Sequence, residues 1–485
     1  MRRAFLTNLL LLLALNLLVK PFYILGIDAG VQRAVGAEAY GSYAALLSLG
    51  FLLNIVLDLG LTNYSTRHVA RHTHLMGKYL GGVAAVRMAL LLAYAVLTVA
   101  TGVVLGYRGE RLGMLGWLVL NQGLVASILY LRSNIAGAQR FRWDSLLSVL
   151  DRVLLIGGVG WLLWGRAAGE PFRIEWFVWA QTLSYAVTFL VALAFVLRLS
   201  GPVSMAWRPA FSIVVVRQSF PFAVLILLMT FYYRIDTVML ERMLPDGALQ
   251  AGIYYQGFRW FEALNMLGYL VAGLLLPMFS RMLQERADVT PLAGLAFRLV
   301  LVASLAAAVF GSLHAAGVMG LLYADHVAEA ARVFALLIWC FAAVCTTYVF
   351  GTLLTAGGEL RLLNWMAAGG AVLNIALNAL LIPRLQAEGA AWAALVTQVL
   401  TATAQVVLAA RMHRLAGIAP TLFRAALYAT GLAGLGLGLD RLALPFWMTG
   451  LVFALLAAGA ALLTGLLRPA ELRAAMALEG TGRQG

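Results

Sequence analysis

The stretch FLTNLLLLLALNLLVKPFYILGI, residues 5–27, is the first of many long apolar runs in this chain. A helix of about 20 apolar residues crosses a hydrocarbon core about 30 Å thick. Arg2 and Arg3 precede the run as in a signal sequence, but no small-residue cleavage site follows a short apolar core, so we expect the run to be retained. The same reading along the chain predicts about fourteen helices, at approximately 5–27, 40–63, 79–107, 112–135, 145–165, 176–197, 213–240, 250–280, 292–311, 330–356, 362–383, 386–411, 421–439 and 446–467.

The composition requires lipid as the solvent for most of the surface. Hydrophobic residues make up 62% of the 485 positions and charged residues 12%, which is too little polar surface for a protein of this size in water. The connections between the predicted helices are short and leave no room for a soluble domain. The sequence has no G-x-x-x-x-G-K-[ST] phosphate loop and therefore no ATPase of its own. We expect an all-α polytopic membrane protein.

The net charge of +14 indicates membrane topology and not nucleic-acid binding. Basic residues gather in the loops on one side of the predicted membrane, such as Arg140 and Arg142 in one loop and Arg198 in another. Cytoplasmic loops of membrane proteins carry such an excess of Lys and Arg. We therefore predict that the amino and carboxyl termini both lie in the cytoplasm.

Metal and catalytic chemistry have little support in the sequence. Cys340 and Cys345 are five residues apart in an apolar helix, which favours packing over metal binding or redox chemistry. His314, Asp325 and His326 lie in the largest external segment, where an ordinary wet interface accounts for them. We expect no enzyme activity, no metal and no cofactor, with H⁺ or Na⁺ as the coupling ion if transport is coupled.

A weak internal repeat relates the second predicted helix to the eighth. Because six helices separate the copies, both run in the same direction, which indicates two parallel halves related by an axis along the membrane normal. We predict an N-lobe over 1–212 and a C-lobe over 213–412, of six helices each, with 413–485 forming two further helices and a cytoplasmic tail. At an offset of 211 positions, Gly41, Tyr43, Leu53 and Asn54 correspond to Gly252, Tyr254, Leu264 and Asn265.

Ionisable residues at membrane depth are the strongest functional signal. Each costs about 2.5–3.5 kcal/mol even on lenient insertion scales, so each needs a partner, water or a task. They concentrate in predicted helices 1, 2, 7 and 8, the equivalent pairs of the repeat, and Arg87 in helix 3 adds one more; this favours a hydrated, net-basic cavity between the lobes. Arginine donates paired hydrogen bonds to phosphate oxygens, so this cavity suits an anionic substrate such as a lipid pyrophosphate. The predicted substrate-binding cations are Lys20, Arg87, Arg234 and Arg259, and the predicted ion-coupling or cavity carboxylates are Asp28, Asp58, Asp236 and Glu262.

The alternative that these charges only pair with one another to hold helices together stays open. Arg259 and Glu262 are three residues apart and share one helix face, where they can form an ion pair. Arg234 and Asp236 are two apart and face different neighbours; Asp236 is the first candidate to accept a proton or Na⁺. A second set lies near cytoplasmic helix ends and is assigned to anchoring by snorkelling: Arg132, Asp151, Arg152 and Arg298.

Helix 1 carries residues that predict a bend. Pro21 removes a backbone hydrogen bond in the middle of the run, and Gly26 and Gly30 follow it. A bend at this place would gate the cavity during alternating access. A static kink is equally compatible with the same residues.

Three stretches resemble one family, the polysaccharide flippases of the multidrug, oligosaccharidyl-lipid and polysaccharide exporter (MOP) superfamily. RAVGAEAYGSYAALLSLGFLLNIVLDLGL, residues 33–61, is similar to the family's segment that enters and leaves helix 2. YYRIDTVMLERML, residues 232–244, is similar to its Arg-x-Asp pattern at the end of helix 7, and AGIYYQGFRWFEALNML, residues 251–267, to its entry into helix 8. The resemblance implies two six-helix bundles around a cationic cavity that carries undecaprenyl-pyrophosphate-linked oligosaccharide repeat units from the cytoplasmic to the external leaflet.

Fourteen helices also resemble the lipid II flippases of the same superfamily, so a lipid II flippase is the second hypothesis. An ion-coupled drug exporter of the same fold is the third, and a membrane glycosyltransferase or polymerase is the fourth. The resemblance implies a bacterial inner membrane, membrane lipid and a lipid-linked oligosaccharide as partners, contact with other polysaccharide-assembly proteins, and function as a monomer.

Overall fold

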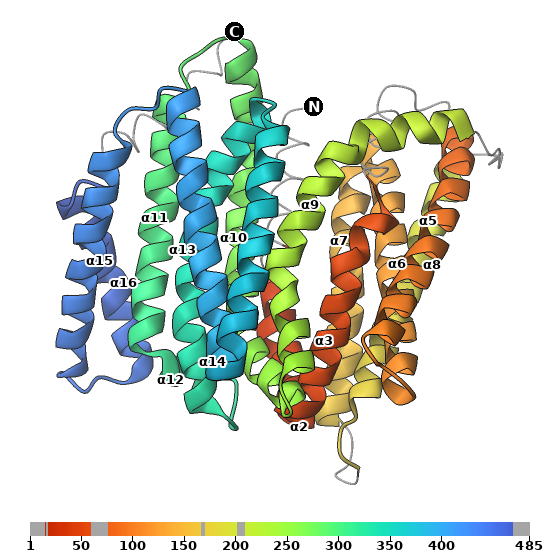
Figure 1. Ribbon diagram of the computed structural model, residues 1–485, viewed down its shortest axis with the longest axis horizontal. Helices are drawn as coiled ribbons and strands as arrows, with labels where there is room; N and C mark the ends of the chain where they lie inside the picture. Colours follow the sequence, from red (N-terminus) through yellow and green to blue (C-terminus); the bar gives the residue numbers. More distant parts are fainter. Residues whose placement is uncertain (1–14, 16–17, 60–75, 166–169, 201–208, 469–485) are drawn as a thin grey trace. The chain divides into compact units, whose positions relative to one another are not determined.

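The computed structural model describes residues 15, 18–59, 76–165, 170–200 and 209–468, and these residues form helices and short connections (Figure 1). Eleven helices in the described part are long and apolar enough to cross a membrane. The longest, α14 (Leu360–Met412), joins two predicted spans across Gln386, whose φ of 53° is not helical. The contacts within the chain form two compact units. Unit 1 takes the described residues up to Tyr255 together with Ile375–Ala390, and unit 2 takes Gln256–Asn374 and the residues from Ala391 on.

Unit 1 contains the helices of the first half of the chain and the beginning of those that follow. A buried cluster that includes Val86, Tyr130, Leu147 and Val196 packs α5, α6, α7 and α8 together. The helices are η1 (Tyr23–Asp28), α2 (Ala29–Val35), α3 (Ala37–Leu53), η2 (Asn54–Leu57), α5 (Met76–Val104), α6 (Glu110–Gly137), α7 (Phe141–Gly160), η4 (Trp161–Gly165), α8 (Ile174–Ser200), α9 (Pro209–Met243) and the first nine residues of α10 (Gly247–Gln284).

Unit 2 contains the rest of α10, both outer parts of α14, and the last helices of the chain. Here α11 and α13 pack along each other, α15 packs on α11, and α16 lies against α15 and α11 (Figure 1). The interior is aromatic: the rings of Phe297 and Phe350 are 4.8 Å apart, and those of Phe310 and Phe453 are 5.2 Å apart. The helices are α11 (Thr290–Leu313), α12 (Ala315–Gly320), α13 (Val327–Ala356), α15 (Ile418–Asp440) and α16 (Phe446–Leu463).

The units do not coincide with the predicted lobes. Residues 209–255 and 375–390, which the sequence assigns mostly to the C-lobe, pack within unit 1. This division groups residues by contact and does not test the lobe boundaries at 212 and 412, which stay a prediction. The predicted tail after residue 468 lies outside the described residues.

The first two predicted helices have different ends in the structure. Helix 1 continues past Ile27 to Val35, and Gly36, with a φ of 82°, joins it directly to α3. Only glycine adopts this backbone conformation at little cost. Asp28 is therefore inside a helix. The second predicted helix corresponds to α3, which stops at Leu53; a short 3₁₀ segment follows, and Asp58 lies in a turn. Residues 60–63 of the predicted helix lie outside the described residues.

Candidate functional site

Six of the eight predicted charged site residues lie in unit 1, and Arg259 and Glu262 lie in unit 2. Lys20 is half-buried at the start of the described part of helix 1, directly before Pro21. The helix then widens into the π-helical segment η1, Tyr23–Asp28, which contains Gly26. A proline that removes a backbone donor is a common cause of such an irregular turn. The gating role of Pro21, Gly26 and Gly30 stays a prediction.

Arg87 of α5 is held from three sides. Its Nη1 donates to Asp58 Oδ1 at 3.2 Å, and its Nη2 donates to the Ala126 carbonyl oxygen at 2.6 Å. Its guanidinium carbon lies 4.6 Å from the centre of the Tyr130 ring. The Arg87 side chain is 9% exposed and that of Asp58 is 32% exposed. Two predicted site residues thus form one ion pair that joins the end of helix 2 to α5.

Arg234 of α9 meets two aromatic residues. Its Nη1 donates to the Tyr255 hydroxyl at 2.9 Å, and its guanidinium carbon lies 4.5 Å from the centre of the Phe51 ring in α3. An aromatic ring contacts the flat face of a guanidinium. The N–H donors lie in the plane of the guanidinium, around its edge, and can still donate to oxygen atoms. This arrangement places a positive charge among α3, α9 and α10.

Asp28 and Asp236 share one type of environment. Asp28 Oδ2 accepts a hydrogen bond from the Tyr40 hydroxyl at 2.7 Å, and Asp236 Oδ2 accepts one from the Tyr254 hydroxyl at 2.8 Å. Asp236 Oδ1 also accepts from Asn378 Nδ2 at 2.6 Å. Each aspartate is 1% exposed. Buried carboxyl groups that contact neutral donors are chemically suited to bind a proton or a small cation.

In unit 2, Arg259 Nη1 donates to Glu262 Oε2 at 2.5 Å, the i, i+3 ion pair that their spacing predicts. Arg259 is 7% exposed. Within the residues that the structure describes, no three His, Cys, Asp or Glu side chains gather closely enough to hold a metal ion.

Sequence reasoning assigned Arg152 of α7 to anchoring at a helix end, but the structure places it against two aromatic rings. Its guanidinium carbon lies 4.6 Å from the Tyr23 ring centre, and its Nη1 donates to the Tyr185 hydroxyl at 2.9 Å. Its Nε lies 3.7 Å from Asp151 Oδ2. Adjacent acidic and basic residues in an otherwise apolar run were the signal for this position. Arg152 joins helix 1 to α8 and belongs with the candidate site.

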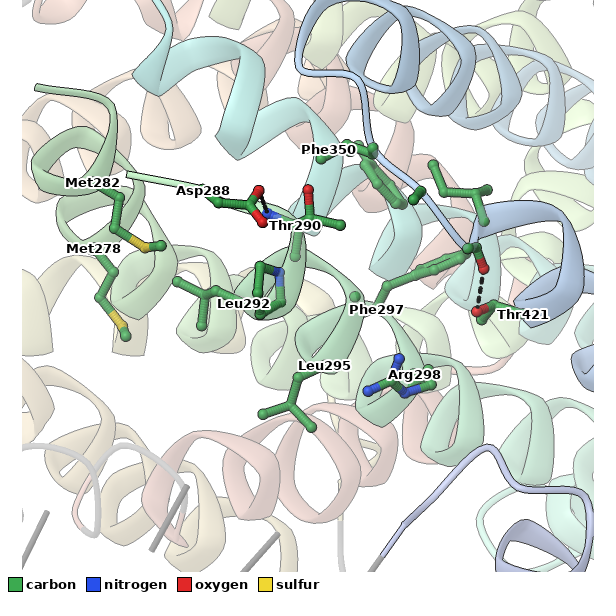
Figure 2. Close-up of a pocket in the computed structure, with 17 residues that line it drawn as sticks. Met278, Met282, Asp288, Thr290, Leu292, Leu295, Phe297, Arg298, Phe350 and Thr421 are labelled. Carbon is green, nitrogen blue, oxygen red and sulfur yellow. Dashed lines mark hydrogen bonds between the residues drawn. The ribbon is translucent and has the colours of Figure 1, made fainter. Parts of the chain in front are cut away.

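A separate pocket of about 840 Å³ lies in unit 2, among the end of α10, the start of α11 and the start of α15 (Figure 2). Its wall is mostly apolar, with Met278, Met282, Phe297 and Phe350 among the lining residues, and Arg298, a predicted anchor, lies on one side. At its edge Asp288 Oδ1 accepts a hydrogen bond from the Thr290 backbone N–H at 2.9 Å, and the hydrogen bonds from Thr290 lower the pKa of Asp288. None of the eight predicted charged site residues lines this pocket.

The fold is that of MOP superfamily transporters. The chain is similar to the lipid II flippase MurJ in its inward closed conformation, with a TM-score of 0.70 and 10% identity over 94% of this chain and 98% of that one. It is also similar to an inward-facing multidrug resistance MATE family transporter, with a TM-score of 0.60 and 15% identity over 81% of this chain and 94% of that one. A Vibrio cholerae MATE transporter, VcmN, gives a TM-score of 0.58 and 16% identity over 85% and 97%. These likenesses confirm the predicted all-α polytopic fold of about fourteen helices.

The family model described as polysaccharide biosynthesis protein matches residues 5–283, more than half of the chain. The chain belongs to this family. No curated protein matches it. The predicted family and its fold are therefore confirmed: this is a multi-pass membrane protein of the polysaccharide biosynthesis family, with the fold of MOP superfamily transporters.

Proposed function

We propose that the chain is a flippase that moves undecaprenyl-pyrophosphate-linked oligosaccharide repeat units from the cytoplasmic to the external leaflet by alternating access. Family membership supports the polysaccharide pathway. One observation carries the mechanism: Arg87 and Arg234, buried or half-buried, are each held against an aromatic ring inside a helical membrane protein. Such residues are expensive at membrane depth and mark substrate pathways by default.

The chemistry of the held arginines fits a pyrophosphate. A guanidinium presents planar N–H donors that match two phosphate oxygens at once, and stacking on a ring fixes its orientation. Arg87, Arg234 and Arg259 therefore serve as the anion-binding groups of the proposal, with Lys20 beside the irregular turn of helix 1. Their carboxylate partners, Asp58 and Glu262, hold the arginines in place when no substrate is bound.

The proposal assigns ion coupling to Asp236. Its carboxylate is buried and receives hydrogen bonds from Tyr254 and Asn378. Binding of H⁺ or Na⁺ would cancel its charge and change the balance of these contacts. Asp28, with Tyr40, is the second candidate for the same role.

The test is reconstitution in liposomes with a fluorescent undecaprenyl-pyrophosphate oligosaccharide, in which the labelled lipid reaching the outer leaflet is measured. We expect Arg234→Ala and Arg259→Ala to slow translocation by about tenfold or more, the effect of losing one charged hydrogen bond. We expect Asp236→Asn to remove the dependence on an ion gradient. Arg281→Ala is the matched control, because Arg281 forms an exposed pair with Glu285. Unchanged translocation in all three site variants would overturn the site assignment.

A lipid II flippase is the second candidate, favoured by the likeness to MurJ over 94% of the chain. Both substrates are lipid pyrophosphates, so the same arginines serve either. A parallel liposome arm with fluorescent lipid II separates them: faster translocation of lipid II than of the oligosaccharide lipid selects this candidate. An ion-coupled drug exporter predicts translocation of organic cations, which we do not expect from a site with several cations.

The remaining expectations belong to the same proposal. We place the chain in a bacterial inner membrane, with both termini in the cytoplasm and function as a monomer. Cysteine labelling of the loops from either side of right-side-out vesicles tests the topology.

A further inference from the structure

A pair of glycines brings two helix backbones of unit 1 into direct contact. Gly41 lies in α3 and Gly252 in the first part of α10. A Cβ atom on Gly41 would lie 1.8 Å from the Ala248 carbonyl oxygen, and one on Gly252 would lie 1.9 Å from the Ala37 carbonyl oxygen. Both neighbours are backbone atoms, which cannot turn aside as a side chain can. Glycine is therefore the residue that this crossing requires.

The crossing is symmetric in the terms of the internal repeat. Ala37 corresponds to Ala248 and Gly41 to Gly252 at the same offset of 211 positions. Each glycine faces the alanine carbonyl of the other copy. The two copies of one sequence element thus meet face to face, as expected where a two-fold axis passes between them. Gln32 Nε2 donates to the Gly252 carbonyl oxygen at 2.9 Å and adds a buried polar bond to the contact.

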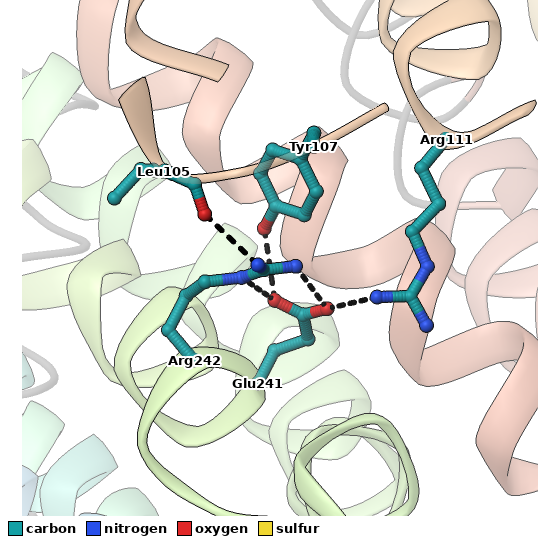
Figure 3. A network of polar contacts seen from close by, with 5 residues as sticks. All are labelled: Leu105, Tyr107, Arg111, Glu241 and Arg242. Atoms are coloured by element: carbon teal, nitrogen blue, oxygen red, sulfur yellow. Dashed lines mark hydrogen bonds and ion pairs between the residues drawn. The ribbon is translucent and has the colours of Figure 1, made fainter. Parts of the chain in front are cut away.

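A second connection in unit 1 joins the end of α9 to the α5–α6 connection (Figure 3). Glu241, whose side chain is 2% exposed, accepts hydrogen bonds from the Tyr107 hydroxyl at 3.0 Å and from Arg111 Nη1 at 2.9 Å. Arg242 pairs with the same carboxylate and donates through Nη1 to the Leu105 carbonyl oxygen at 2.9 Å. Burial is the main cause, and the charge of Glu241 the second, of a raised pKa of Tyr107. The hydroxyl therefore keeps its proton and can donate it to a hydrogen bond.

Both connections link elements before residue 112 to elements in 241–252, and both lie near the α9–α10 turn. We propose that the glycine crossing and the Glu241 cluster together form an outer latch, which closes the external end of the transport route and must part for substrate release. The predicted topology places the α5–α6 and α9–α10 connections on the external side. The crossing supplies close van der Waals contact, and the ion cluster is reversible because its members regain water when they separate.

The alternative is a permanent structural joint that never opens. It predicts that adding a methyl group at either glycine unfolds the protein or leaves the external end closed. The latch predicts a folded protein whose external end is open for a larger share of the time. These outcomes differ in accessibility from the outside, which can be measured without any substrate.

Ser48 provides the reporter. It lies seven residues after Gly41 on the same face of α3, two turns further along, and is 0% exposed. In a background with Cys340→Ala and Cys345→Ala, Ser48→Cys is labelled from outside by a membrane-impermeant maleimide in right-side-out proteoliposomes. We expect slow labelling in this background and labelling about tenfold faster with Gly41→Ala or Gly252→Ala, a shift of tenfold in the open population.

The matched controls are Gly113→Ala and Gly116→Ala in α6, where an added Cβ meets nothing within 4 Å. We expect no change in labelling from either. Glu241→Gln is the milder second variant: it keeps the shape of the side chain, removes the charge, and should speed labelling by severalfold. Size-exclusion chromatography and thermal unfolding show which variants are folded.

Unchanged labelling in folded Gly41→Ala and Gly252→Ala, together with unchanged labelling in Glu241→Gln, overturns the latch. If the glycine variants do not fold, Glu241→Gln alone decides. The inference draws its meaning from the proposed transport function, but the two fail separately. Labelling without transport rejects the flippase proposal alone, and transport without the labelling change rejects the latch alone.

Discussion

Unit 1 and unit 2 are both built from apolar helices, yet they bury different groups. Unit 1 buries Asp28, Arg87, Asp236 and Glu241, each with a named polar partner. In the described part of unit 2, Arg259 is the one charged residue that is buried, and ring contacts such as Phe297 with Phe350 fill the interior. Buried charge is thus concentrated where elements far apart in the sequence meet. Unit 2 is stabilised mainly by the packing of apolar and aromatic side chains.

The largest loss in the free energy of unfolding is expected from Arg87→Ala in unit 1. It leaves Asp58 without the cation that faces it, and breaking a buried pair costs about 3–5 kcal/mol; the partial exposure of Asp58 places this case near 3 kcal/mol. Unfolding in detergent micelles measures the loss. Arg87→Lys keeps a positive charge and is expected to lose less. A loss no larger than in Arg281→Ala would remove the distinction between the two units.

Phe350→Ala probes unit 2 in the same assay. Removing a buried ring leaves a space beside the pocket of Figure 2, and the lost packing costs about 2 kcal/mol, below the value in soluble proteins because lipid solvates the separated helices. Phe423→Ala is the control, because Phe423 is 73% exposed. Equal losses at the two positions would show that unit 2 is not held by its interior packing.

Tyr254→Phe sharpens the comparison within unit 1. It removes the hydroxyl that donates to Asp236 and keeps the ring, so we expect a loss of about 0.6–1 kcal/mol. Tyr40→Phe, which removes the corresponding donor to Asp28, should lose a similar amount. In liposomes, Tyr254→Phe should alter ion dependence more than Tyr40→Phe if Asp236 is the coupling residue. The reverse order would move that role to Asp28.

The smallest change in unfolding and in translocation is expected from Arg281→Ala. Its side chain is 80% exposed and pairs with Glu285 one helical turn away, and such exposed, solvent-screened pairs contribute little to stability. Unfolding and translocation should both stay close to those of the unchanged protein. A large loss in either would show that exposure in this structure does not measure importance.

Much of the fold follows from the sequence, because the spacing of apolar runs and the thickness of a bilayer leave few choices. The helix ends were harder. Helix 1 runs on to Val35, and a single glycine in an unusual backbone conformation, Gly36, replaces the longer connection that the predicted helix ends at 27 and 40 leave between the two helices. Such a joint depends on the packing of both helices and has no signal in hydropathy.

The candidate site also has a part that the sequence predicts and a part that it does not. That Arg87, Arg234 and Asp236 need partners follows from their cost in lipid, and the Arg259–Glu262 pair follows from helical spacing. The partners of the others come from distant helices: Tyr130 for Arg87, Phe51 for Arg234 and Asn378 for Asp236. Pairwise contact of that kind is not encoded locally, which is why Arg152 and Glu241 were missed. The glycine crossing is different, since the repeat offset already related its two members.

The π-helical segment Tyr23–Asp28 determines the direction, around the helix axis, in which the side chains after it in helix 1 point. A π turn accommodates one residue more than an α turn of similar rise, so the segment behaves as a regular helix with one inserted residue. Deleting one residue inside the segment should restore a regular α turn and leave Gln32 aimed at the Gly252 carbonyl oxygen. The same deletion in the regular helix α2 would rotate the side chains beyond it by roughly 100° and turn the remaining ones away from their partners.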